Sequence, residues 1–190
     1  MKIGFALLLN DECHNYIREI QLELHQKFGT HLARQTPHIT IKSPFDVPQP
    51  FQSLAPFYAY VESLAKQTKP FEIFFDGFNS FGQNVFFLDV VANPALHQLH
   101  KKILNDVQVH FGLTPHAFEG EKVKFHASVA GFQEEEKFEK VRSFLAGYQP
   151  KFSFQANRLA VFYYLGTGNG WIVNRIIKME NGEWKMENGE

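Results

Sequence analysis

The chain has 190 residues, 21 of them phenylalanine, and its formal net charge is −1. This length suffices to bury a sizeable core in one domain or in two small lobes. The near-neutral charge and the lack of a basic stripe argue against binding to a long nucleic-acid tract, so we expect a small substrate or a single nucleotide terminus.

Cysteine usage and the N-terminal residues bear on the cellular compartment. The single cysteine, Cys13, excludes an intramolecular disulfide and suits a reducing environment. It falls at the expected start of a helix, where a thiol can become reactive, but no basic partner is assured. The apolar run 3–9 is too short to span a membrane and lacks a signal cleavage site. We therefore expect a cytoplasmic monomer with no membrane partner.

The first half of the chain alternates strand and helix patterns. The apolar run 3–9 reads as a strand, and residues 11–28 carry apolar side chains near a 3.6-residue spacing, which predicts a helix ended by Gly29. The string Pro37-His38-Ile39-Thr40-Ile41 follows as a strand. A second helix is expected at about 51–66, where Lys69-Pro70 stops it, and 71–75 is strand-like.

The second half repeats this order. Residues 85–91 read as a strand, Pro94 opens a helix, and Gly112 ends it, as Gly29 ends the first helix. The string Phe125-His126-Ala127-Ser128-Val129 follows, then a helix at about 134–146. Residues 152–164 read as one long strand and 171–177 as the closing strand. Each half is therefore predicted to be strand, helix, histidine strand, helix and strand.

Alternation of this kind usually indicates a parallel α/β sheet. The successive strands 71–75 and 85–91, joined by a loop with Gly and Asn, favour antiparallel pairing instead, so we predict an α+β fold. We expect residues 1–177 to be one domain with a pseudo-two-fold repeat of about 3–78 and 85–177, whose elements can be exchanged between lobes. The tail 178–190 repeats the sequence KMENGE, and its Asn-Gly pair predicts a hairpin or a frayed end.

The two histidine strings are the main functional signal. Side chains alternate between the faces of a strand, so His38 and Thr40 share one face, as do His126 and Ser128. Either histidine alone is best read as a hydrogen-bonded core residue. Because the duplication puts both strings at equivalent points with matching hydroxyls, a pair facing each other across one cleft is the favoured interpretation.

Paired His-x-Thr/Ser-x strings, one in each half of a duplicated chain, resemble the 2H phosphoesterase superfamily, which includes 2′-5′ RNA ligase-like proteins and cyclic nucleotide phosphodiesterases of RNA processing. The resemblance covers about residues 3–177. It implies a bilobal fold with two antiparallel sheets facing a central cleft and helices outside. It also implies that His38, Thr40, His126 and Ser128 are catalytic, with serine at a place where threonine is commoner.

These residue types suit the opening of a cyclic phosphodiester. One histidine can take a proton from water while the other protonates the leaving ribose oxygen. The two hydroxyls can donate hydrogen bonds to the non-bridging oxygens. This chemistry needs no metal and no cofactor. The expected substrate is a 2′,3′-cyclic phosphate or a 2′-5′ linked nucleotide or RNA end; the direction of reaction, hydrolase or ligase, and the acid and base assignments stay open.

Four neighbouring residues are candidates for substrate binding. Lys42 follows Thr40 by two positions, and Lys124 precedes His126 by two, so unbroken strands would put both on the motif faces. The alternative for each is an ordinary solvated lysine. Phe45 and Phe132 follow the two strings and can stack on a base, although the abundance of phenylalanine favours core packing.

Two other functional classes compete with the phosphoesterase. One is a non-catalytic nucleotide- or RNA-binding module of the same fold. The other is a metallohydrolase with His38 and His126 as ligands. His97 and His100 lie three apart on a predicted helix and would need a third ligand to hold a metal, so a solvated helix face is the favoured reading for them.

Overall fold

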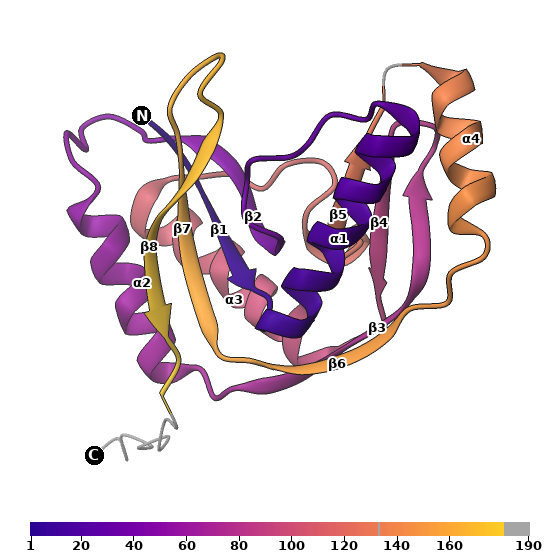
Figure 1. Cartoon of the computed structure of the whole chain (residues 1–190). Coiled ribbons are helices and arrows are strands. Elements are labelled where there is room, and N and C mark those ends of the chain that lie inside the picture. Colours follow the sequence, from indigo (N-terminus) through magenta and orange to yellow (C-terminus); the bar gives the residue numbers. More distant parts are fainter. Residues whose placement is uncertain (133, 181–190) are drawn as a thin grey trace, which may run out of the picture.

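In the computed structural model, which describes residues 1–132 and 134–180, two four-stranded antiparallel sheets form the body of the protein (Figure 1). This confirms the predicted α+β fold. The first sheet has the order β2 (His38–Asp46), β1 (Lys2–Leu8), β7 (Arg158–Tyr164) and β8 (Trp171–Lys178). The second has the order β5 (His126–Gly131), β4 (Val85–Val90), β3 (Phe71–Phe81) and β6 (Lys151–Ala156).

Strands and helices do not stay with their own half of the chain. The second sheet includes β3 from the first half, and the first sheet includes β7 and β8 from the second. Helix α1 (Asp11–Phe28) joins two strands of the first sheet but packs against β5 and against α4 (Glu135–Leu145). In the opposite sense, α3 (Pro94–Phe111) joins β4 and β5 but packs on β2, and α2 (Ala55–Gln67) packs on β7 and β8. The helices thus cover the outer sides of both sheets (Figure 1).

Helices α1 and α3 begin and end in the same way, and their bounds agree with the prediction. The side chains of Asn10 and Asn93 accept a hydrogen bond from the backbone N–H three residues on, which satisfies a donor in the first turn. Gly29 and Gly112 end the helices with φ of 62° and 66°, a conformation that favours glycine. The duplication therefore extends to the helix caps.

The expected single strand 152–164 is wrong. The chain leaves the second sheet at Ala156 and enters the first at Arg158, with Asn157 between them. The carbonyl of Asn157 accepts a hydrogen bond from the backbone N–H of Met179, which fixes this crossing to the end of β8. Gln155, Asn157 and Arg158 interrupt the apolar pattern at this crossing, but a polar break alone does not show that the chain passes from one sheet to another.

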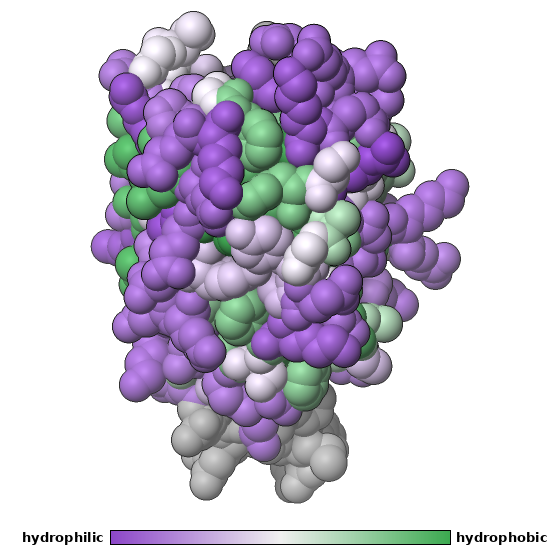
Figure 2. All heavy atoms as spheres, turned by 45° about the vertical axis from the view of Figure 1, so that its right-hand side comes forward, coloured by the Kyte–Doolittle hydropathy of each residue, from purple (hydrophilic) through white to green (hydrophobic). Residues whose placement is uncertain are grey.

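A single aromatic-rich core joins the helices to both sheets, and Phe57 stacks on Phe111 between α2 and α3 with a centroid distance of 4.3 Å. Cys13 belongs to this core. Burial raises the pKa of its thiol to about 11, so it stays protonated rather than reactive. Figure 2 shows hydrophilic side chains over most of one face, with apolar ones in smaller groups between them.

None of the helices in the described ranges combines the length and the apolar character that crossing a bilayer requires. Met179, which directly follows the end of β8, is buried. The hairpin predicted for the tail falls on residues 181–190, which lie outside the described residues.

Candidate active site

The two histidine strings form β2 and β5, the strands at one edge of each sheet, and these two strands contact each other. His38 pairs with Leu8 of β1, and His126 pairs with Asp89 of β4. Because the two sheets meet along these edges, the residues of both motifs are brought to one region of the protein. The fold thereby supplies the arrangement that the duplication only suggested.

Each motif strand is interrupted at the same point. Ala6 pairs with Thr40 and Phe5 with Lys42, which leaves Ile41 as an extra residue in β2. On β5 the register likewise shifts after Ser128, leaving Val129 as the extra residue. A one-residue bulge of this kind bends the strand and re-aims the side chains that follow it. The histidine and the hydroxyl residue therefore share a face, and the next positions leave that face.

The imidazoles have matching hydrogen bonds. Nδ1 of His38 lies 2.7 Å from the carbonyl oxygen of Thr36, and Nδ1 of His126 lies 2.8 Å from that of Lys124. A carbonyl oxygen only accepts, so each Nδ1 carries the hydrogen and donates it. Each neutral ring consequently has an unprotonated Nε2, which can accept a proton, and each charged ring has an Nε2–H, which can give one away.

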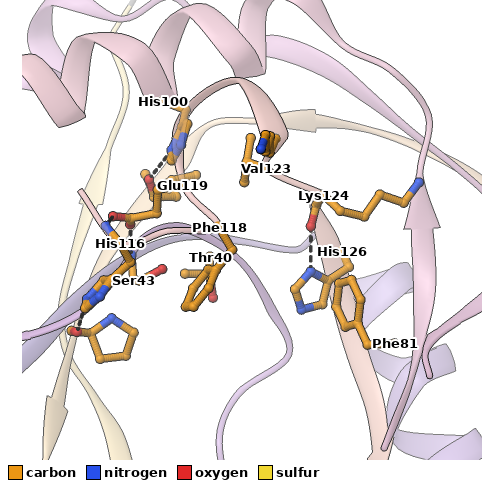
Figure 3. Close-up of a pocket in the computed structure, with 13 residues that line it drawn as sticks. Thr40, Ser43, Phe81, His100, His116, Phe118, Glu119, Val123, Lys124 and His126 are labelled. Atoms are coloured by element: carbon orange, nitrogen blue, oxygen red, sulfur yellow. Dashed lines mark hydrogen bonds between the residues drawn. The ribbon is translucent and has the colours of Figure 1, made fainter. Parts of the chain in front are cut away.

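Two adjoining cavities receive the four motif residues. The smaller, of about 250 Å³, is lined by His38, Thr40 and Ser128, together with Trp171. The larger, of about 640 Å³, is lined by His126 and also by Thr40 (Figure 3). Thr40 and Pro44 border both, so the cavities adjoin, with His38 and Ser128 on the smaller and His126 on the larger. The structure thus brings together all four residues that the sequence nominated as catalytic.

Burial makes both imidazoles weaker bases than usual. The pKa of His38 falls to about 4, mainly through burial; the bond to Thr36 opposes this shift, and the nearby His126 adds to it. Burial also lowers the pKa of His126, but the carboxylate of Asp89 acts in the opposite direction. In the free protein both rings are therefore neutral near pH 7. The carboxylate of Asp89, which acts on His126, has no counterpart among the groups that shift the pKa of His38.

The expectation that Lys42 shares the face of His38 is wrong for its ammonium, although Lys42 does border the smaller cavity with His38. It assumed an unbroken strand, but the bulge at Ile41 turns the Lys42 side chain to the buried side, where it is 1% exposed. Its Nζ donates to Oε2 of Glu119 at 2.8 Å. This ammonium is thus committed to an ion pair inside the protein.

Glu119 is the centre of a buried polar cluster that holds the segment before β5 against β2. Besides Lys42, its carboxylate accepts from the backbone N–H of Ser43 at 2.7 Å and of His116 at 2.8 Å. His100, expected on a solvated helix face, is instead 2% exposed beside it. Nδ1 of His100 donates to the carbonyl of Ile41 at 2.8 Å, and Nε2 accepts from the backbone N–H of Gly120 at 2.9 Å. These bonds fix the wall of the larger cavity (Figure 3).

The other three candidate binding residues are placed as follows. Lys124 lines the larger cavity, and its ammonium forms an ion pair with Asp89 while remaining 45% exposed. Phe45 and Phe132 are 7% and 8% exposed and belong to the main core. Core packing, which the composition favoured for both phenylalanines, is what the structure shows. Of the two lysines, Lys124 therefore keeps a substantially exposed side chain at the site, whereas Lys42 is buried.

Reasoning from the sequence did not identify four residues of the site: Asp89, Glu119, Phe81 and Phe118. Phe81 and Phe118 line the larger cavity and are 39% and 67% exposed. The sequence held one usable signal, because Phe118 is a large apolar residue in the segment 112–120, which has glycine at both ends and a proline and no helical or strand period. Nothing local pointed to Asp89 or Glu119.

The metal-ligand alternative needs a third group near the histidines. Within residues 1–132 and 134–180, no set of three or more His, Cys, Asp or Glu side chains is gathered closely enough to hold an ion. His97 packs edge-on against Phe125 at 5.0 Å between ring centroids, and His100 has both nitrogens bonded to backbone.

Comparison with known proteins gives consistent results. Residues 9–168 match the 2′-5′ RNA ligase superfamily. A Bacillus cytotoxicus protein named as a candidate phosphoesterase is 28% identical over 139 residues, which is 69% of this chain and 77% of the relative. A crystal structure of TT0787 from Thermus thermophilus has a TM-score of 0.57 at 15% identity, covering 96% of this chain and all of that one. Escherichia coli LigT, crystallised with NADP+, has a TM-score of 0.53 at 14% identity, covering 94% of each chain.

The buried ion pair gives a stability prediction. Replacing Lys42 with Met leaves the Glu119 carboxylate buried without its counter-charge, which costs about 3–5 kcal/mol of unfolding free energy. Lys42→Met/Glu119→Gln removes both charges and is expected to cost less than the sum of the single substitutions. Urea denaturation measures both. Lys140→Met, which removes the same type of charge from the exposed pair with Glu136, is the matched control and should change little. Equal effects of the two lysine substitutions would contradict the assigned role of the pair.

Proposed function

Because the chain belongs to the 2′-5′ RNA ligase superfamily, we propose that it is a 2H phosphoesterase that hydrolyses a 2′,3′-cyclic phosphate or a 2′-5′ linkage at a nucleotide or RNA end. The observation that carries the proposal is the pair of imidazoles with equivalent Nδ1 bonds, which line two adjoining cavities together with the hydroxyls of Thr40 and Ser128. The candidate phosphoesterases of Bacillus cytotoxicus and Bacillus licheniformis support the same reaction class.

The proposed reaction is an in-line displacement at phosphorus. A neutral imidazole accepts a proton at Nε2 from water, whose oxygen forms the new bond to phosphorus. The bond from phosphorus to the ribose oxygen breaks, and the second imidazole, which starts charged, gives its Nε2 proton to that oxygen. The hydroxyls of Thr40 and Ser128 donate to the non-bridging oxygens, where negative charge must be held. One proton enters the pair and one leaves it, so the site returns with its charge unchanged.

The surroundings of the two rings favour different starting states. Asp89, opposite His126 on β4, stabilises the charged form of that ring, whereas His38 has no carboxylate among the groups that shift its pKa. The free protein therefore binds a proton at His126 before His38. We infer that His126 is the proton donor to the leaving oxygen and that His38 is the base.

Removing either imidazole tests the site. His38→Ala and His126→Ala are each expected to lower turnover of a 2′,3′-cyclic nucleotide by roughly 10²–10⁴-fold, which is the usual contribution of a positioned proton-transfer group. His110→Ala, an exposed histidine at the end of α3, serves as the control and should retain activity. The assay is run over 2′,3′-cyclic nucleotides and 2′-5′ linked dinucleotides with chelator present. Tight nucleotide binding without turnover by the unaltered protein would favour the non-catalytic module.

The acid and base assignment has its own test. A p-nitrophenyl phosphodiester releases an anion that needs no proton, so loss of the acid matters less with it than with an alkyl ester. His126→Ala should therefore lose much less activity on the aryl ester, whereas His38→Ala should lose about the same on both. The measurement is the ratio of kcat/KM values for the two esters. If His38→Ala, and not His126→Ala, lost much less activity on the aryl ester, the acid and base assignments would be reversed.

The pKa directions predict the pH dependence. The active form holds one proton on the histidine pair, and burial lowers the pKa of His38 to about 4 and that of His126 below its usual 6.5. Above the upper value the acid is lost, and below the lower value the base is charged. We expect a bell-shaped profile of kcat/KM with its maximum between about 4 and 6.5, because this quantity reports the free enzyme. A maximum on the alkaline side of pH 7 would contradict the lowered values.

A further inference from the structure

The larger cavity has a feature that acid–base chemistry does not need. Two phenylalanine side chains line it from separate elements: Phe81 from the end of β3, and Phe118 from the segment between α3 and β5. They are 39% and 67% exposed, although most phenylalanines of the chain are at least partly buried in its core. Exposed aromatic surface is unfavourable in water, and the free-energy cost is removed when a ligand covers that surface. Their position in the cavity that His126 lines therefore indicates a ligand that covers them.

Phe81 is held in place by its neighbours. Its ring meets the ring of His126 edge-on at 4.8 Å between centroids, and it packs on Phe87 at 4.5 Å. Figure 3 shows the Phe81 ring directly against His126. A group that stacks on the exposed part of Phe81 would consequently lie within reach of an atom attached to the reacting phosphate.

Phe118 is exposed without belonging to a loose loop. Its neighbour Glu119 is the centre of the buried polar cluster, and its ring lies parallel to that of His116, with an interplanar angle of 8° and a centroid distance of 5.8 Å. Figure 3 shows the Phe118 ring on the Thr40 side of the space, away from Phe81. The segment thus holds the Phe118 ring in a fixed position in the cavity.

The remaining lining indicates the chemistry of the occupant. Lys122 and Lys124 supply positive charge, while Ile41, Val123 and the two rings supply apolar surface. Among the described residues that line the cavity there is no Asn, Gln, Asp or Arg, and the carboxylate of Glu119 is engaged by Lys42 and two backbone N–H groups; Thr40 and Ser43 supply hydroxyls. A flat, aromatic group attached to a phosphate fits this set.

We propose that Phe81 and Phe118 form a stacking site for the nucleobase of the substrate, and that it accepts all four bases. This rests on the proposed function and narrows the substrate to one with a base next to the cleaved phosphate. Stacking is tolerant because every base has an aromatic face, and one base–aromatic contact typically contributes ten-fold or more to binding. The buried cluster around Glu119 would then act as the support that keeps Phe118 over the site.

The test compares substrates with and without a base. Phe118→Ala should lower the ratio of kcat/KM for the four 2′,3′-cyclic nucleotides to that for ribose 2′,3′-cyclic phosphate by roughly tenfold. Phe118→Trp should keep the ratio. Phe74→Ala removes a phenylalanine that is 46% exposed on β3 outside this cavity, so it is the matched control and should not change the ratio. Phe81→Ala is expected to act like Phe118→Ala.

Three results would overturn the stacking site: an unchanged ratio in Phe118→Ala, an equal fall in Phe74→Ala, or a hundredfold preference for one base. Calorimetry with 3′-nucleotides and with ribose 3-phosphate separates this inference from the proposed function. If the unaltered protein turns over none of these esters but binds 3′-nucleotides more tightly than ribose 3-phosphate, and Phe118→Ala abolishes the difference, the reaction is wrong and the stacking site stands. Equal affinity for both compounds would refute the stacking site.

Discussion

The contact between the edge strands β2 and β5 is the constraint on which the rest of the site depends. A free sheet edge exposes unpaired backbone groups and invites unwanted pairing. Here each sheet turns its motif strand toward the other, so the two edges that carry His38 and His126 meet inside one molecule. The exchanged helices lock this arrangement, because α1 leaves its own sheet to pack on β5 and α3 leaves its own to pack on β2.

The duplicated backbone carries unequal side chains around its two motif histidines. The position facing His126 is Asp89, whereas the one facing His38 is Leu8. Just past the bulges, Lys42 corresponds to Ala130, so the buried ion pair with Glu119 has no counterpart in the second half. Two identical imidazoles with identical Nδ1 bonds therefore experience different electrostatic surroundings. A perfectly symmetric pair would have no reason to divide the acid and base roles.

Local features of the sequence predicted the local structure well. The helices at 11–28 and 94–111 follow from apolar spacing and glycine ends, and the pairing of hydroxyl with histidine follows from strand alternation. Antiparallel pairing was predicted from the successive strands 71–75 and 85–91, and the superfamily from the two histidine strings. What failed depended on distant partners: the bulge that buries Lys42, the change of sheet at Asn157, and the pairing that puts Asp89 beside His126. Phe118 was not predicted as a site residue because the exposure of its side chain depends on how the segment 112–120 packs in the folded protein.

The exchange of strands also has a consequence for the order in which the protein is made. β1 lies between β2 and β7, but β7 begins at Arg158, so the ribosome completes most of the chain before this central strand gains its second neighbour. Until then the first sheet has only two strands and lacks its long-range partner, and a two-stranded sheet is marginal on its own. Until β7 is synthesised, one edge of β1 therefore lacks its native backbone partner, which is the kind of exposed strand edge that makes partly made chains prone to aggregation.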